Sequence, residues 1–382
     1  MPTTPQPIDD STLDRLREVG DPPADDALCE LFESDGGSGR AVERVNQILR
    51  SLERNEDPLP AGLPPGLLRF FAATAELPPW ADLAVIERGN DLLGRYMPQM
   101  LIALYCASLP SCYAARKGVQ VLYLSQRMRK DVYRRILETA QFLLDVLDEG
   151  GLGPRGCGRR SAQKVRLLHA SIRYHLRRHG RWDPSLGVPI NQEDLAGTLL
   201  SFSVAVPEGL QRLGVSLTPD ERDAYYHAFR VVGHLLGVDP RVNLERYYDG
   251  LALAERIAER HHAPSEEGQL LTANLLAFLA EVLPGQLFDG MPAALIRHLS
   301  GDRVADLLAV PQADWTRGLI SPLSWLSAVA DEAGDRSALL ARLMSRVGSG
   351  LLNRVFRMLR GEERYQWRIP RSVAEHWADT GD

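Results

Sequence analysis

One histidine between two arginines is the first feature of this sequence that could do chemistry. Arg166, His169 and Arg173 are three and four residues apart, so on a helix they would share one side. An imidazole can bind iron and guanidinium groups can pair with carboxylates, and haem offers both an iron and acidic propionates. The segment therefore favours either a haem site with His169 on the iron or a half-buried histidine beside two solvated arginines.

Two expected helices position this group. The segment 162–179 carries a stripe of apolar residues at the i, i+3, i+4, i+7 spacing, and His169 lies next to that stripe. Another helix is expected at 126–148, and the short glycine-rich connection between the two favours an antiparallel hairpin. Glu138 lies ten residues before the first helix ends, and His169 lies eight after Ser161 begins the second. The two side chains should therefore stand at nearly the same level.

The first helix of this hairpin offers a second reactive cluster. Arg135 lies three residues before Glu138 and four before Thr139, so all three can face the space that His169 faces. A carboxylate near bound oxygen or peroxide could donate or accept the proton that an oxidation needs. Glu138 is thus a candidate acid–base, with Thr139 orienting it. The alternative is a salt bridge between Arg135 and Glu138 that only braces the helix.

Composition narrows the classes of protein. The chain has 382 residues, a hydrophobic content of 45% and a formal net charge of −6. No basic run indicates nucleic-acid binding, and no stretch approaches eighteen consecutive apolar residues, which argues against a membrane span. The four cysteines lack zinc spacing, and the N-terminus carries no basic region followed by an apolar run. We therefore expect a cytoplasmic protein with free thiols.

Other residues compete for the same chemistry. Cys157 follows Gly-Pro-Arg-Gly and resembles part of the thiolate loop of cytochrome P450 enzymes, but the flanking residues of that signature are missing. His227 and His234 are seven residues apart on one expected helix and could be metal ligands or hydrogen-bonded core histidines. The pair 261–262, both histidines, stands at an expected helix end before a proline and should cap carbonyl groups there.

The spacing of the candidate residues resembles a known family. Arg135-x-x-x-Thr139 followed by Arg166-x-x-His169-x-x-x-Arg173 is similar to the catalytic core of the latex clearing protein family of rubber oxygenases. That family shares a domain with fungal oxygenases of mycophenolic acid biosynthesis. The resemblance covers roughly residues 65 to 310 and includes four further stretches. These stretches are Leu77-Pro-Pro-Trp80-Ala-Asp, Gly187-Val-Pro-Ile-Asn-Gln-Glu-Asp-Leu-Ala, Arg230-Val-Val-Gly-His-Leu-Leu-Gly237-Val and Gly301-Asp-Arg-Val-Ala-Asp-Leu-Leu-Ala-Val-Pro.

The resemblance implies a b-type haem held by His169 as the axial ligand, with Arg135, Thr139, Arg166 and Arg173 near the haem or its propionates. It implies a haem-dependent oxidoreductase that uses dioxygen or peroxide, with an electron donor as a further partner. The sequence departs from the rubber oxygenases twice, because Glu138 stands where they have lysine and no export signal is present. Both departures favour a small, apolar substrate in specialised metabolism. The alternative is a haem-binding sensor or scaffold without redox catalysis.

The fold expected from these patterns is all-α. Helical periodicities follow one another from about residue 65 to residue 360, and only 119–124 could be a strand. We expect a single large, globin-reminiscent helical domain with haem buried between helices. Its parts would be an N-terminal accessory arm at 1–60, the haem-binding oxygenase-like domain at 61–312 and a C-terminal helical extension at 313–382.

Overall fold

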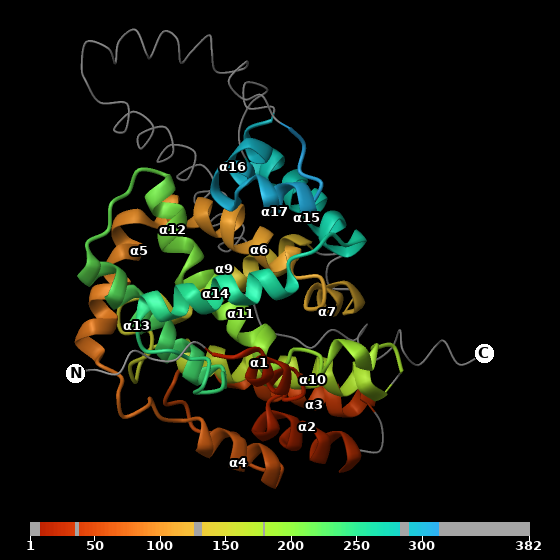
Figure 1. Ribbon diagram of the computed structural model, residues 1–382. Coiled ribbons are helices and arrows are strands. Elements are labelled where there is room, and N and C mark those ends of the chain that lie inside the picture. The colour runs from red at the N-terminus through yellow and green to blue at the C-terminus, as the bar shows by residue number, and fades with distance from the viewer. Residues whose placement is uncertain (1–7, 35–37, 126–131, 179, 283–289, 313–382) are drawn as a thin grey trace, which may run out of the picture.

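The computed structural model describes residues 8–34, 38–125, 132–178, 180–282 and 290–312. Within these ranges every regular element is a helix, and the only β-type pairing is an isolated bridge between Ala115 and His262. The all-α prediction is thus confirmed (Figure 1). In chain order the elements are α1 (Asp10–Arg17), α2 (Pro22–Ser34), α3 (Ser38–Ser51), α4 (Pro65–Ala73), α5 (Leu83–Ala103), the π-helix η1 (Leu104–Ser108), α6 (Leu109–Ala114), α7 (Val119–Leu124), α9 (Val132–Leu147), α10 (Gly158–Arg178), the 3-10 helix η2 (Pro184–Leu186), α11 (Gln192–Ser203), α12 (Ala205–Arg212), α13 (Pro219–Leu235), α14 (Tyr247–His261), α15 (Glu266–Val282), α16 (Met291–Ser300) and α17 (Asp302–Leu307).

The helices α5, η1 and α6 follow one another without a break. Pro98 lies inside α5, and the backbone leaves the helical region at Tyr96 (φ −128°, ψ 18°), because an interior proline cannot donate to the preceding turn. The ambiguous segment 119–124 is the helix α7. The extension expected at 313–382 lies outside the described residues.

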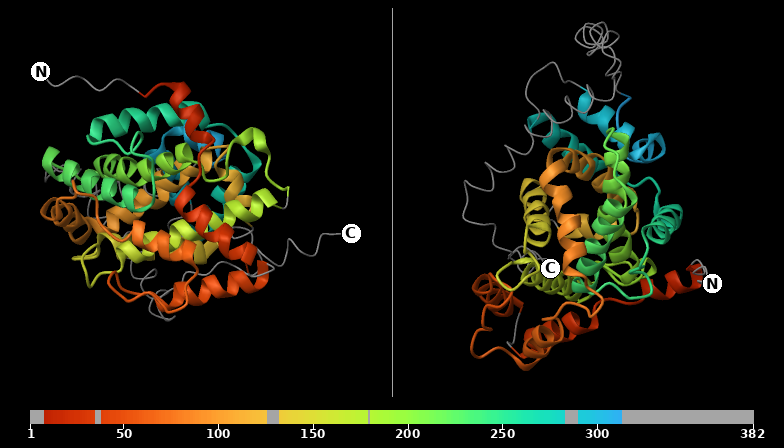
Figure 2. Two further views of the ribbon diagram at one scale, coloured as in Figure 1. Left: turned by 90° about the horizontal axis from the view of Figure 1, so that it is seen from below. Right: turned by 90° about the vertical axis from the view of Figure 1, so that its left-hand side faces the viewer.

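Helix α14 crosses the view in Figure 1 but lies at the edge of the molecule in both views of Figure 2, and it packs on α11, which also packs on α1, α6, α12 and α13. In Figure 1, α2, α3 and α4 form the lower edge and α15, α16 and α17 the upper part; the right-hand view of Figure 2 again places the N-terminal helices at the bottom. Helix α5 packs on α13, α2 packs on both α4 and α10, and α9 packs on α10. The hairpin of α9 and α10 expected from sequence is therefore present, with α2 against α10.

Local signals fix the ends of the helices that border the interior. The Asn191 side chain accepts a hydrogen bond from the Asp194 amide and so caps α11. Helix α13 begins with a capping box of Thr218 and Glu221. After its last turn, Gly237 adopts a left-handed conformation (φ 74°), which an L side chain rarely adopts. These caps set where α11 begins and where α13, which packs on it, begins and ends.

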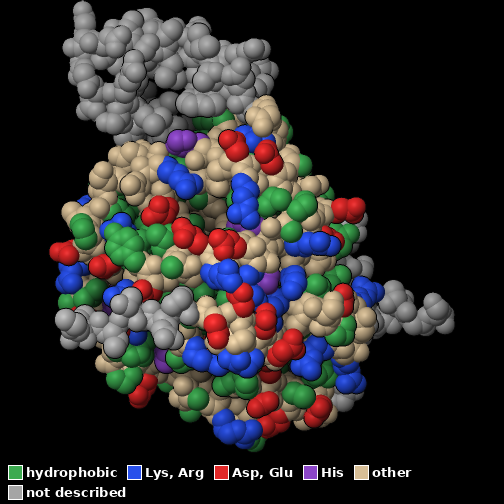
Figure 3. All heavy atoms as spheres, viewed as in Figure 1, with side chains coloured by type: hydrophobic (Ala, Val, Ile, Leu, Met, Phe, Trp, Pro, Cys, Tyr) green, Lys and Arg blue, Asp and Glu red, His purple; other side chains and the backbone are tan. Residues whose placement is uncertain are grey.

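The visible surface carries charges of both signs. Figure 3 shows acidic and basic side chains interspersed across that face rather than gathered by sign. Among the helices that the structure describes, none combines the length and the apolar character that a membrane crossing requires.

Candidate functional site

A cavity of about 360 Å³ lies among α6, α7, α9, α10, α11, α13 and α14. Its wall is mainly apolar, and α10 contributes one face of its helix, with Val165, Leu168 and Ile172 at helical spacing. A mainly apolar wall with a few convergent polar groups is typical of sites for small ligands. The polar residues of this wall therefore decide what the cavity can do.

Three residues singled out in the sequence line this one cavity. His169 comes from α10, and Glu138 and Thr139 come from α9 across the hairpin. Glu138 is only 4% exposed, so it is not part of a surface pair. The equal level of Glu138 and His169 expected from the hairpin thus brings both to the same space. Arg135 lies on α9, but its side chain falls outside the described residues.

The two arginines that flank His169 are buried, and each is paired with a carboxylate. The Arg166 guanidinium donates from Nε to Asp21 Oδ2 and from Nη2 to Asp21 Oδ1, each at 2.7 Å. Arg173 donates from Nε to Asp25 Oδ1 at 2.7 Å. Neither arginine lines the cavity, and neither is solvated as the alternative from sequence required. Both residues join α10 to α2 and the segment before it.

Arg173 also contacts the cavity wall, through a hydrogen bond to Ile190, whose backbone is strained. Arg173 Nη1 donates to the Ile190 carbonyl at 3.2 Å, and Ile190 lines the cavity with a φ of 53°. A β-branched residue rarely adopts positive φ, and such strain persists only where the surroundings impose it. Burial raises the pKa of Asp25, while the charge of Arg173 beside it opposes this rise. Arg173 therefore holds both α2 and the turn that precedes α11.

The competing candidates from sequence lie elsewhere. Cys157 has a free thiol and does not line the cavity. His227 and His234 both lie edge-on to Trp80, and the centroid of each imidazole is 6.0 Å from that of the Trp80 ring. His227 Nε2 also accepts a hydrogen bond from the Asp82 amide at 3.1 Å. The two histidines therefore act in packing and hydrogen bonding at the start of α5.

Sequence reasoning missed a second polar group in the cavity wall. The expectation that the 261–262 pair caps carbonyls is wrong, because the His261 Nε2 lies 2.9 Å from Glu193 Oε2 and the His262 Nε2 lies 3.4 Å from Ser111 Oγ. Both histidines line the cavity. Hydrogen bonds from His261 and Arg260 outweigh the burial of Glu193 and lower its pKa to about 2. The adjacent histidines carried a signal of polarity, but Glu193, the partner of His261, is sixty-eight residues away in the sequence.

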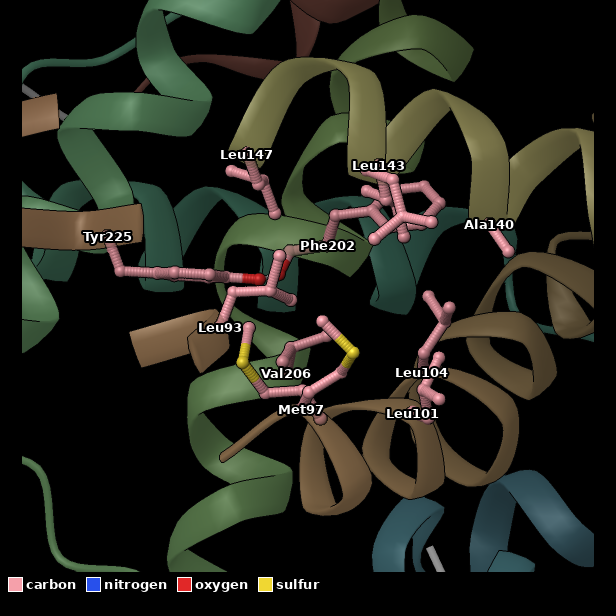
Figure 4. A pocket seen from close by; sticks show the side chains of 12 residues that line it. Leu93, Met97, Leu101, Leu104, Ala140, Leu143, Leu147, Phe202, Val206 and Tyr225 are labelled. Carbon is pink, nitrogen blue, oxygen red and sulfur yellow. Dashed lines mark hydrogen bonds between the residues drawn. The ribbon is translucent and has the colours of Figure 1, made fainter. Parts of the chain in front are cut away.

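A smaller pocket of about 40 Å³ lies beside this cavity (Figure 4). Leucine and methionine side chains from α5 and α9 line it, and Phe202 belongs to the walls of both spaces. The Tyr225 hydroxyl donates to the Phe202 carbonyl at 3.3 Å. This pocket holds no group suited to acid–base or metal chemistry, so the larger cavity is the candidate site.

Comparison with known proteins agrees with the all-α fold. The sequence model of the family "ER-bound oxygenase mpaB/B'/Rubber oxygenase, catalytic domain" matches residues 92–367. A rubber oxygenase from Streptomyces sp. (strain K30) is 29% identical over 324 residues, which cover 83% of this chain and 76% of that protein. The structure of the latex clearing protein in its closed state superposes with a TM-score of 0.74 at 26% identity, covering 88% of this chain and 91% of that one.

These matches are to enzymes, and they include the α9–α10 hairpin that carries His169, Glu138 and Thr139. They favour an oxidoreductase over a scaffold without catalysis, and the resemblance read from the arginine, threonine and histidine spacing is confirmed. The chain belongs to the family of mpaB-type and rubber oxygenase catalytic domains.

Proposed function

We propose that this protein is a b-type haem-dependent oxygenase or oxidase that acts on a small apolar molecule with dioxygen or peroxide. The observation that carries the proposal is the placement of His169, Glu138 and Thr139 in the wall of one largely apolar cavity. Membership in an oxygenase family supports the reaction class. The similar rubber oxygenase acts on an apolar material, as its name states, which supports an apolar substrate.

The residues present fit a haem. One imidazole in an apolar wall suits a macrocycle, because the porphyrin supplies the other iron ligands and its faces are apolar. The His169 nitrogen would bind the iron, and the apolar side chains of α10 on either side would contact the ring. Bound haem would supply the activation of the oxidant. We propose no direct contact between a propionate and Arg166 or Arg173, since that contact would require their carboxylate pairs to open.

The protein's own side chains would then have separate roles in positioning and proton transfer. Arg166 and Arg173 position α10, and with it His169, through Asp21 and Asp25. Glu138, 4% exposed, would hold or deliver a proton at its carboxyl oxygen. Thr139 would orient that carboxyl group or the substrate, and the apolar wall would exclude water.

Haem binding can be tested by spectroscopy. Full-length protein reconstituted with haem should show a Soret band, and His169→Ala should lose or shift it. His234→Ala is the matched control, because His234 packs against Trp80 away from the cavity and should leave the spectrum unchanged. A His169→Ala spectrum identical to that of the unmodified protein would refute the assignment of the ligand.

The size of the substrate can be tested separately. A cavity of about 360 Å³ suits a small molecule, and we propose that polyisoprene is a poor substrate. Oxygen consumption by the haem-loaded protein would be compared between polyisoprene latex and small terpenes. Faster consumption with latex would contradict this part of the proposal.

A further inference from the structure

The smaller pocket of about 40 Å³ is nearly free of polar groups. Leucine and methionine side chains make up most of its wall, and Figure 4 shows those of α5 and α9 pointing toward one another across it. Tyr225 is the one residue with a polar side chain among the described residues of this wall, and its hydroxyl already donates to the Phe202 carbonyl at 3.3 Å. A buried water needs about two to four polar partners, so the pocket suits an apolar guest better than water.

The volume of the pocket limits this guest to a very small molecule. Apolar cavities of about 150 Å³ in other proteins take up benzene, whereas one water needs at least about 10–15 Å³. A pocket of about 40 Å³ lies between these limits, so it has room for a diatomic gas but not for the body of a terpene. Dioxygen is apolar and diatomic, and it gains dispersion energy from each carbon atom that it touches.

The pocket adjoins the larger cavity at α9. Thr139 lines the cavity, and the next residue, Ala140, lines the pocket. Phe202 belongs to both walls, and its ring stacks on Phe229 of the cavity wall, with centroids 6.2 Å apart and planes 6° from parallel. The Phe202 side chain therefore stands between the two spaces, close to the α9 residues that the proposed function uses.

We propose that the smaller pocket is a dioxygen-binding site that supplies the reaction in the larger cavity. Dioxygen occupies the space between the α5 and α9 side chains and enters the cavity past Phe202, whose side chain can change rotamer while the backbone stays in place. It then arrives from the α9 wall, across the hairpin from His169. The supply role rests on the proposed function, because it serves an enzyme that consumes dioxygen. Binding of dioxygen in the pocket does not require haem.

Dioxygen itself is the probe for the binding site, because it is paramagnetic and speeds the nuclear relaxation of nearby methyl groups. Met100 and Met291 are 5% and 3% exposed, so solvent reaches their methyl groups about equally, but only Met100 lines the pocket. Full-length, haem-free protein with isotope-labelled methionine methyl groups would be measured under dioxygen and under argon. We expect dioxygen to speed relaxation more at Met100 than at Met291. Equal effects at the two methyl groups would overturn the proposal.

Two substitutions fill the pocket from α9. Leu143→Phe and Leu144→Phe each add carbon atoms to its wall, whereas Leu270→Phe makes the same change at a residue that is 40% exposed and lines neither space. A guest that loses about ten carbon contacts binds about 5- to 30-fold more weakly, so the relaxation effect at Met100 should fall by this factor in the filled variants and persist in the control. Circular dichroism would confirm folding. A folded, filled variant with the full effect would refute the site.

Turnover separates the supply role from the haem proposal. With haem loaded, the filled variants should show a KM for dioxygen raised by about 5- to 30-fold at an unchanged kcat. Turnover with peroxide should stay the same, because peroxide is polar and gains nothing from an apolar pocket. An unchanged KM for dioxygen, or an equal loss with peroxide, would overturn the supply role. A missing Soret band with the relaxation effect intact would refute only the haem proposal.

Discussion

The ion pair between Arg166 and Asp21 offers the sharpest test of how the site is held. The side chains of Arg166 and Asp21 are 7% and 3% exposed, and two hydrogen bonds of 2.7 Å join them. Arg166 also lies over the Phe70 ring, with Cζ 5.4 Å from the ring centroid. Removal of one partner leaves the other charge buried and unpaired. We expect Arg166→Met to lower the free energy of unfolding by about 3–5 kcal/mol.

A substitution at Asp21, the partner of Arg166, completes a double-mutant cycle. Asp21→Leu replaces the carboxylate oxygens with methyl groups of similar shape, so the double variant buries no unpaired charge. Replacement of a buried pair by apolar residues is often close to neutral, so the double variant should recover most of the loss. Arg69→Met is the surface control. Its pair with Glu30 is exposed, with 70% and 37% of the two side chains accessible, and should contribute about 1 kcal/mol or less.

Urea unfolding followed by circular dichroism would give the stabilities, and the Soret band would report haem retention. If Arg166 only positions α10, the double variant should regain both stability and haem. If Arg166 touches a propionate, the double variant should regain stability and still lose haem. The second result would refute the positioning role. A single variant as stable as the unmodified protein would refute the buried pair itself.

Three further perturbations follow from the same contacts. Glu138→Gln should leave haem loading unchanged and slow the oxidation by a factor of about a hundred or more in stopped-flow mixing with oxygen or peroxide, and an unchanged rate would remove Glu138 from the mechanism. Burial lowers the pKa of His262 to about 4 in the folded protein. Between pH 6.5 and 4 this histidine is therefore protonated in the unfolded chain but neutral in the folded protein. The free energy of unfolding should fall by up to about 3 kcal/mol as the pH drops through this range. Urea unfolding of His262→Asn should show a flatter pH dependence, and an equal slope would count against this origin. Gly237→Ala would place Cβ 2.8 Å from Arg166 Cζ at a φ of 74°. Gly62→Ala is the control, because Gly62 has a similar φ of 76° but has no atom within 4 Å of the added Cβ. Thermal melting should therefore show a larger fall in the melting temperature for Gly237→Ala than for Gly62→Ala. Equal losses would mean that Arg166 is not crowded.

The sequence allowed prediction of the features that depend on neighbours along the chain. The helical periodicity of 162–179 predicted α10 (Gly158–Arg178), and the short connection predicted its antiparallel packing on α9. From these two facts alone, Glu138 and His169 were expected at one level, and both line the cavity. Capping residues such as Thr218 also depend only on close neighbours, since a cap acts within one helical turn.

Partners far apart in the sequence could not be predicted. Asp21 stands 145 residues before Arg166, and no periodicity connects them. The arginines therefore looked free to bind a cofactor, although the fold pairs them with carboxylates. The His261 contact with Glu193 was missed for the same reason. A histidine at a helix end can cap the last carbonyl groups of its own helix or bind a residue far away in the sequence, and the local pattern is the same in both cases. Local rules identify which groups are polar, but the fold decides which group each one meets.

One short segment supplies contacts both to Glu193, beside His261, and to the two arginines on either side of His169. Arg17 donates to Glu193, which orients His261, while Asp21 and Asp25 bind the two arginines on either side of His169. This segment, 17–25, precedes the part of the chain that the family model matches, which begins at residue 92. It contacts α10 and α11 at once, so it fixes where one helix stands relative to the other. A substitution within 17–25 would therefore shift His169 relative to His261 without replacing any residue of the cavity wall.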